Sequence, residues 1–199
     1  VHRYEKWARL QIEWERMRDE TIRNLKFPFP YREGQFNLAA SVYRTIARKK
    51  KLFIQAPTGT GKTMAVLYPA VRAMGEGLGE KIFYLTARTI TRTVAEQAFF
   101  ILKEKGLKFR SVTLTAKEKI CFCEKAECNP QACPYAKGHF DRVNDAVYDL
   151  LKNGGGMGRK EIEEQAQKFQ ICPFEFALEL SVWADGIICD YNYVFDPNA

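Results

Sequence analysis

The stretch Ala56-Pro57-Thr58-Gly59-Thr60-Gly61-Lys62-Thr63 decides the fold, because its glycines and lysine are spaced as in a nucleotide phosphate loop. An apolar run over 51–55 predicts a buried strand before it, and helical spacing over 61–74 predicts a helix after it. In that setting backbone N–H groups face the phosphates, the lysine adds positive charge and the last hydroxyl binds Mg²⁺. The predicted nucleotide site comprises Thr58, Gly59, Thr60, Gly61, Lys62 and Thr63, the last two being catalytic.

Strand and helix patterns alternate along the rest of the chain. Alternation of this kind predicts a parallel sheet flanked by helices, so we expect an α/β fold. A glycine run over 154–158 follows a helix rather than a strand, which favours a flexible linker over a second phosphate loop. Strands are expected over 81–86, 110–115 and 186–189, and helices over 1–26, 33–48, 90–105, 139–152, 160–169 and 174–183.

Composition excludes several classes of protein. The 199 residues are 46% hydrophobic and 28% charged, which is typical of a globular rather than a disordered chain. Apolar runs are too short for a membrane span, and the charged start lacks a signal-peptide core, so a cytoplasmic protein is expected, near the nucleoid if bacterial. The 31 basic and 24 acidic residues give a net charge of +7, which favours nucleic acid as partner. The missing initiator Met indicates a piece of a longer protein.

Two further segments carry polar side chains suited to ligands. Gln35 follows an aromatic–proline segment at 27–31, and its amide can both donate to and accept from adenine; an ordinary surface glutamine is the alternative. Thr86, Arg88 and Thr89 follow a predicted strand, where parallel sheets place ligands. Their hydroxyls and guanidinium suit phosphodiester contacts, although Thr89 is equally suited to cap the next helix.

Four of the six cysteines cluster in one stretch, which in a chain without a secretory signal indicates metal binding rather than disulfides. Gaps of 6, 4 and 38 residues separate the candidate ligands and do not form the two tight pairs usual for zinc. A proline after two of them is a modest indication of iron–sulfur ligation. Zinc and unligated core cysteines remain alternatives, and Cys123 can substitute for Cys121. The candidate ligands are Cys121, Cys128, Cys133 and Cys172.

These motifs together resemble the XPD/DinG family of DNA helicases, over a span from about Phe27 to the end. The resemblance rests on the phosphate loop with its upstream glutamine, on Ile171-Cys172-Pro173-Phe174, and on Asp190, Tyr191, Tyr193, Asp196 and Pro197. It implies a RecA-like motor domain that uses ATP and Mg²⁺ and unwinds DNA from 5′ to 3′. It further implies a four-iron four-sulfur cluster on the four candidate cysteines. Gln35 would then recognise adenine, and Thr86, Arg88 and Thr89 would contact single-stranded or forked DNA.

The resemblance also implies a division of the chain. We expect an N-terminal helix or linker over 1–26, motor domain 1 over 27–115, an inserted, mainly helical iron–sulfur module over 116–172, and a return to the motor over 173–199. The family's Asp-Glu-Ala-His box is missing, and Asp190 is left without a role. The arch domain and the second motor domain are missing too, so this chain alone should not turn over ATP.

The sequence therefore leaves two candidate functions. The first is the N-terminal part of a helicase, with a nuclease-like domain possible upstream and further helicase domains downstream. The alternative is a non-motor module that binds nucleotide and DNA and is stabilised by a zinc or iron–sulfur site. A zinc-binding P-loop kinase has no supporting substrate motif in the sequence.

Overall fold

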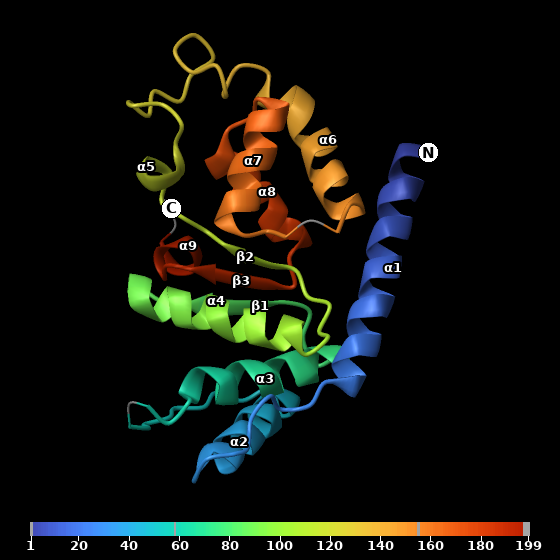
Figure 1. The fold of residues 1–199 in the computed structure, drawn as a ribbon, viewed down its shortest axis with the longest axis vertical. Coiled ribbons are helices and arrows are strands. Elements are labelled where there is room, and N and C mark those ends of the chain that lie inside the picture. Colours follow the sequence, from blue (N-terminus) through green and yellow to red (C-terminus); the bar gives the residue numbers. More distant parts are fainter. Residues whose placement is uncertain (1, 58, 155, 197–199) are drawn as a thin grey trace.

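A three-stranded parallel sheet lies at the centre of the protein (Figure 1). The computed structural model describes residues 2–57, 59–154 and 156–196. The strands are β1 (Ile82–Leu85), β2 (Ser111–Thr113) and β3 (Gly186–Cys189), in the order β1-β3-β2. All four residues of β3 are buried, as expected for a central strand of a parallel sheet. The predicted α/β class, a small parallel sheet flanked by helices, is confirmed.

Helices cover both faces of this sheet. In Figure 1, α3 and α4 lie on one side, α6, α7 and α8 on the other, and α1 runs along the edge of both layers. No helix among the described residues has the length and apolar character needed to cross a bilayer. The helices are α1 (His2–Asn24), α2 (Gln35–Ala47), α3 (Lys62–Gly75), α4 (Thr89–Glu104), α5 (Lys117–Ile120), α6 (His139–Lys152), α7 (Arg159–Phe169), α8 (Pro173–Trp183) and α9 (Asn192–Phe195).

The alternation of side chains along β3 creates two hydrophobic cores. Ile187 joins the core that contains Phe176 and Leu180 of α8, whereas Ile188 joins the core on the α4 side. There Phe99 stacks on Phe109 with ring centroids 5.1 Å apart. Each face of the sheet is therefore closed by its own helices, and the predicted helices at 139–152 and 174–183 are confirmed as parts of one layer.

The predicted strand over 51–55 is wrong. The segment forms no strand, and Phe53 is 92% exposed. An extended segment becomes a strand only when a neighbour pairs with its backbone, and neither edge of the described sheet pairs with this one. The apolar run was therefore not sufficient to predict a strand, and the helix after the phosphate loop forms without one.

A buried carboxylate attaches α1 to the sheet. Asp185, which is 3% exposed and directly precedes β3, accepts hydrogen bonds from Trp14 Nε1 at 3.0 Å and Arg18 Nη1 at 2.8 Å. The backbone N–H of Arg110 donates to the same carboxylate at 2.8 Å. Nearby, Trp7 stacks on Trp183 at 4.7 Å between ring centroids. The predicted N-terminal helix is therefore confirmed, and it packs on the sheet and on α8.

Replacing this carboxylate should destabilise the whole fold. We expect Asp185→Leu to lower the free energy of unfolding by about 3 to 5 kcal/mol, because it removes the buried carboxylate partner and leaves the half-buried Arg18 guanidinium with the contact to Asp19. Urea unfolding measures the change. Glu163→Gln, which breaks the exposed pair with Arg159, is the control and should cost about 0.5 kcal/mol or less. Equal effects of the two substitutions would contradict the role given to Asp185.

Candidate functional site

The phosphate loop curls back on itself at the start of α3. Gly59 and Gly61 have φ angles of 81° and 72°, a left-handed conformation that glycine adopts without strain. Lys62 Nζ donates to the carbonyl oxygens of Ala56 at 2.7 Å and Pro57 at 2.6 Å. The lysine therefore lies over the loop, where a phosphate can take the place of the carbonyls. Thr58, a predicted site residue, lies outside the described residues.

Gln35 lies directly against this loop, although 26 residues separate it from Gly61. Its Nε2 donates to the Gly61 carbonyl at 3.2 Å, and its Oε1 accepts from the Arg32 backbone N–H at 3.1 Å. A Cβ added to Gly61 would lie 2.5 Å from Gln35 Nε2, and the φ of 72° would strain any residue other than glycine there. At 6% exposure Gln35 is no surface residue, which makes the surface alternative wrong. Adenine recognition stays a prediction.

Arg32 is a loop contact that the sequence analysis missed. Its guanidinium donates through Nη1 to the Gly59 carbonyl, and its own backbone N–H holds the amide of Gln35. The side chain is exposed, so it lies at the rim of the loop. The only signal in the sequence was a basic residue three positions before the glutamine, which is too common to be diagnostic.

The loop after β1 has one buried and two exposed polar side chains. Thr86 is buried, and its Oγ1 accepts the Arg88 backbone N–H at 3.2 Å, so this hydroxyl shapes the loop. Arg88 and Thr89 are exposed at the carboxyl end of the strand. Arg88 is the N-cap residue of α4 and Thr89 is already helical, so the alternative that Thr89 caps this helix is wrong. Contact with DNA remains a prediction for all three.

The four cysteines predicted as ligands line a single pocket of about 150 Å³. Cys121 directly follows α5, and Cys172 is the N-cap residue of α8. The two others belong to the loop between α5 and α6. The protein thus brings together cysteines up to 51 positions apart in the sequence (from 121 to 172). The lining residues include Cys121, Cys128, Cys133 and Cys172, but not Cys123.

Two thiols of this region lie close together, but the cysteines that the structure describes do not surround a single point. Cys123 Sγ lies 3.8 Å from Cys133 Sγ, and burial together with the neighbouring thiols raises the pKa of Cys123 to about 11. Burial also raises the pKa of Cys172, so a metal would have to displace thiol protons. Within the described residues, no group of three or more histidine, cysteine or acidic side chains has the arrangement needed to hold a metal ion.

A histidine that lines this pocket has one hydrogen-bonded ring nitrogen and one without a partner among the described residues. His139, the first residue of α6, is 3% exposed and lines the cysteine pocket. Its Nδ1 accepts the backbone N–H of Cys172 at 3.3 Å, whereas its buried Nε2 has no partner among the described residues. Burial lowers the pKa of the imidazole, which favours the neutral ring. The sequence analysis missed His139.

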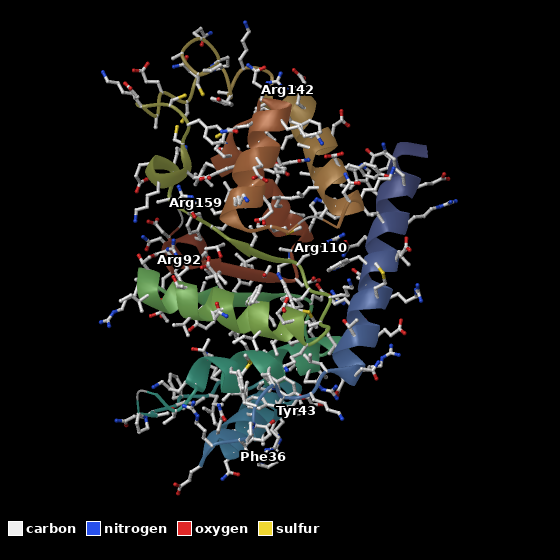
Figure 2. The ribbon with its side chains drawn as sticks, viewed as in Figure 1. Phe36, Tyr43, Arg92, Arg110, Arg142 and Arg159 are labelled. Atoms are coloured by element: carbon white, nitrogen blue, oxygen red, sulfur yellow. The ribbon has the colours of Figure 1, made fainter. Side chains whose placement is uncertain are left out.

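Arg142 holds together the segments that carry two of the cysteines (Figure 2). Its Nε donates to Phe169 O at 2.9 Å, and Nη2 donates to Lys137 O at 2.8 Å and Gln170 O at 2.6 Å. Phe169 is the last residue of α7 and Gln170 is its C-cap, whereas Lys137 belongs to the loop before α6. The guanidinium therefore fixes the segment before Cys172 against the segment after Cys133. Nothing in the sequence pattern distinguished it from other arginines.

A parallel sheet with a glycine-rich phosphate loop at a helix start is typical of the nucleotide-binding α/β class of domains. The comparison with known families agrees. The DEAD/DEAH box helicase family matches residues 37–128, and the DEAD_2 family matches residues 86–199. The second match covers more than half of the chain, so the chain belongs to the DEAD_2 family, the XPD/DinG type of helicase.

Similar proteins are also named as helicases. A probable ATP-dependent helicase of Methanocaldococcus jannaschii is 45% identical over 195 residues, covering 79% of this chain and 30% of the relative. Regulator of telomere elongation helicase 1 homologs of Caenorhabditis briggsae and Caenorhabditis elegans are each 25% identical, covering 87% of this chain and 22% of the relative. The chain thus spans less than a third of the length of these relatives.

Removing the Arg142 guanidinium should loosen the cysteine region. We expect Arg142→Leu to lower the free energy of unfolding by about 2 kcal/mol, because hydrogen bonds from a charged donor to three carbonyls are lost. Urea unfolding of the metal-free protein checks this. Arg142→Lys should recover only part of the stability, since an ammonium cannot reproduce the planar fork. A loss no larger than that of Arg9→Leu, at an exposed position of α1, would refute the role.

Proposed function

We propose that this chain is the first motor domain of an ATP-dependent DNA helicase that moves 5′ to 3′ along one strand and carries a four-iron four-sulfur cluster. The observation that carries the proposal is the pocket lined by Cys121, Cys128, Cys133 and Cys172 in a chain of the DEAD_2 family. A phosphate loop alone is common to many nucleotide-binding proteins, whereas the combination with four gathered thiols is not explained by nucleotide binding.

The nucleotide site is proposed to form around the phosphate loop. The contacts of Lys62 with Ala56 O and Pro57 O keep its ammonium over the loop, ready to exchange them for phosphate oxygens. Gly61 leads into α3, whose N-terminal backbone N–H groups favour an anion. Thr63 follows at the second position of that helix and would bind Mg²⁺. Gln35 would recognise adenine through its remaining amide hydrogen and lone pair.

A surface for the DNA backbone is proposed at the carboxyl end of β1. Arg88 and Thr89 are exposed there, and Thr86 fixes the turn that presents them. The net charge of +7 supports attraction to a polyanion. Unwinding would also need an Asp-Glu-Ala-His box and a second motor domain, and this sequence contains neither. We therefore propose unwinding for a longer protein that includes this domain.

The donor set of the pocket supports a cluster rather than a single ion. A tetrahedral zinc ion holds its four sulfurs roughly 3.8 Å apart, given Zn–S bonds of about 2.3 Å. Cys123 and Cys133 approach that spacing at 3.8 Å, but Cys123 is not among the pocket-lining residues. Four cysteines around a hollow of about 150 Å³ suit a larger inorganic group. When bound, the cluster would supply structural cross-linking and electron-transfer capacity.

The metal content of cysteine variants tests the cluster. Protein purified without oxygen should be brown and contain iron and sulfide, and serine at position 121, 128, 133 or 172 should remove most of the iron. Cys189→Ala is the matched control, because this cysteine is buried within β3 and should leave the iron in place. Iron loss in Cys123→Ser but not in Cys121→Ser would exchange the two ligands. A colourless protein with stoichiometric zinc would discard the cluster in favour of the zinc-stabilised module.

A reciprocal pair of variants tests the two binding surfaces. Lys62→Ala should weaken ATP–Mg²⁺ binding about tenfold or more and abolish ATP hydrolysis in the longer protein, because a charged contact to phosphate is lost. Arg88→Ala should leave nucleotide affinity unchanged but weaken single-stranded DNA binding and reduce its salt dependence by about one unit of slope. Fluorescence binding titrations measure both. If either variant affects both ligands equally, the assignment of separate surfaces is wrong.

A further inference from the structure

The imidazole of His139 carries a hydrogen that no described group accepts. A neutral imidazole has one donor and one acceptor nitrogen. Since Nδ1 accepts the backbone N–H of Cys172, the hydrogen must lie on Nε2. That nitrogen is buried and makes no hydrogen bond within the described part of the chain. A buried donor without an acceptor costs about 1 to 3 kcal/mol, so its acceptor is expected to arrive with a ligand.

The surroundings of the ring show what kind of acceptor that is. His139 lines the same pocket as the four candidate ligands, and its bonded partner, Cys172, is one of them. The pocket also contains the carboxylate-bearing Glu175, but no hydrogen bond joins it to His139 Nε2. The acceptors that the proposed metal centre would bring are sulfur atoms, either cysteine thiolates or inorganic sulfide.

We propose that His139 donates a hydrogen bond from Nε2 to a sulfur of the metal centre, and that this bond holds the reduction potential of the centre above the value it would otherwise have. The inference rests on the proposed four-cysteine centre. A hydrogen bond to sulfur withdraws negative charge from the cluster and favours its reduced form. His139 is a positioning residue, because its Nδ1 also fixes the backbone of Cys172.

The same geometry argues against His139 as a ligand. A histidine that binds a metal through Nε2 needs a lone pair there and a hydrogen on Nδ1, which it normally donates to a carbonyl or carboxylate. Here Nδ1 faces a backbone N–H instead, and that contact would become a clash of two hydrogens. The ring therefore keeps its hydrogen on Nε2, and the cysteines provide the ligands of the proposed centre.

Redox titration of the iron-loaded protein tests the hydrogen bond. His139→Leu removes the donor and should shift the potential to a more negative value at unchanged iron content. His139→Gln retains an N–H donor and should lie closer to wild type. Phe140→Leu alters the neighbouring pocket-lining side chain without removing a donor and should leave the potential unchanged. Equal potentials in wild type and His139→Leu, or equal shifts in the leucine and glutamine variants, would overturn the inference.

A measurement on the wild-type protein covers the case in which His139→Leu does not retain iron. Pulsed EPR of the reduced centre, with ¹⁵N-labelled histidine, should detect an exchangeable proton and a weak nitrogen coupling, and His139→Gln should remove the nitrogen coupling. A strong coupling typical of direct ligation, or no coupling at all, would refute the hydrogen bond. Absence of iron from the wild-type protein would instead refute the proposed metal centre, so the two failures are distinguishable.

Discussion

The pairing of β3 between β1 and β2 is the constraint on which the rest of the structure depends. The chain leaves the sheet after Thr113 and returns at Gly186. Because β2 and β3 are neighbours, the intervening segment must begin and end close together. Because β3 is buried on both faces, its position tolerates little change. This closure returns Cys172 to the neighbourhood of Cys121. The cysteine pocket is thus a product of sheet topology as much as of the loop that carries most of the thiols.

The same topology orders the three candidate sites. The phosphate loop precedes α3, and the loop proposed to contact DNA and the cysteine-bearing loop follow β1 and β2. In Figure 1 all three lie toward the side to which the carboxyl ends of the strands point. Parallel sheets place their ligands at this edge because loops and helix N-termini gather there. One edge of a small sheet thereby carries all the chemistry proposed for the chain.

The sequence was sufficient to predict helices, strands and candidate sites wherever the local pattern agrees with the tertiary structure. The bounds of α6 and β3 follow from apolar periodicity, and the gathering of four cysteines follows from their clustering and the Cys-Pro pairs. The strand predicted over 51–55 failed because apolar character does not supply a pairing partner. His139 and Arg142 could not be predicted from the sequence. Each forms hydrogen bonds with backbone atoms that are distant in sequence, at Cys172, Phe169 and Gln170. Contacts of this kind produce no periodic pattern in the sequence.

Arg142 also bears on the order in which the protein matures. Its three carbonyl contacts, and the packing of Ala146, Ile162 and Phe176, hold α6, α7 and α8 together without any contribution from sulfur ligation. Cys128 meanwhile stays exposed at the rim. The helical scaffold therefore does not depend on sulfur ligation, and the proposed metal centre would form in an acceptor that is already folded and has one open thiol.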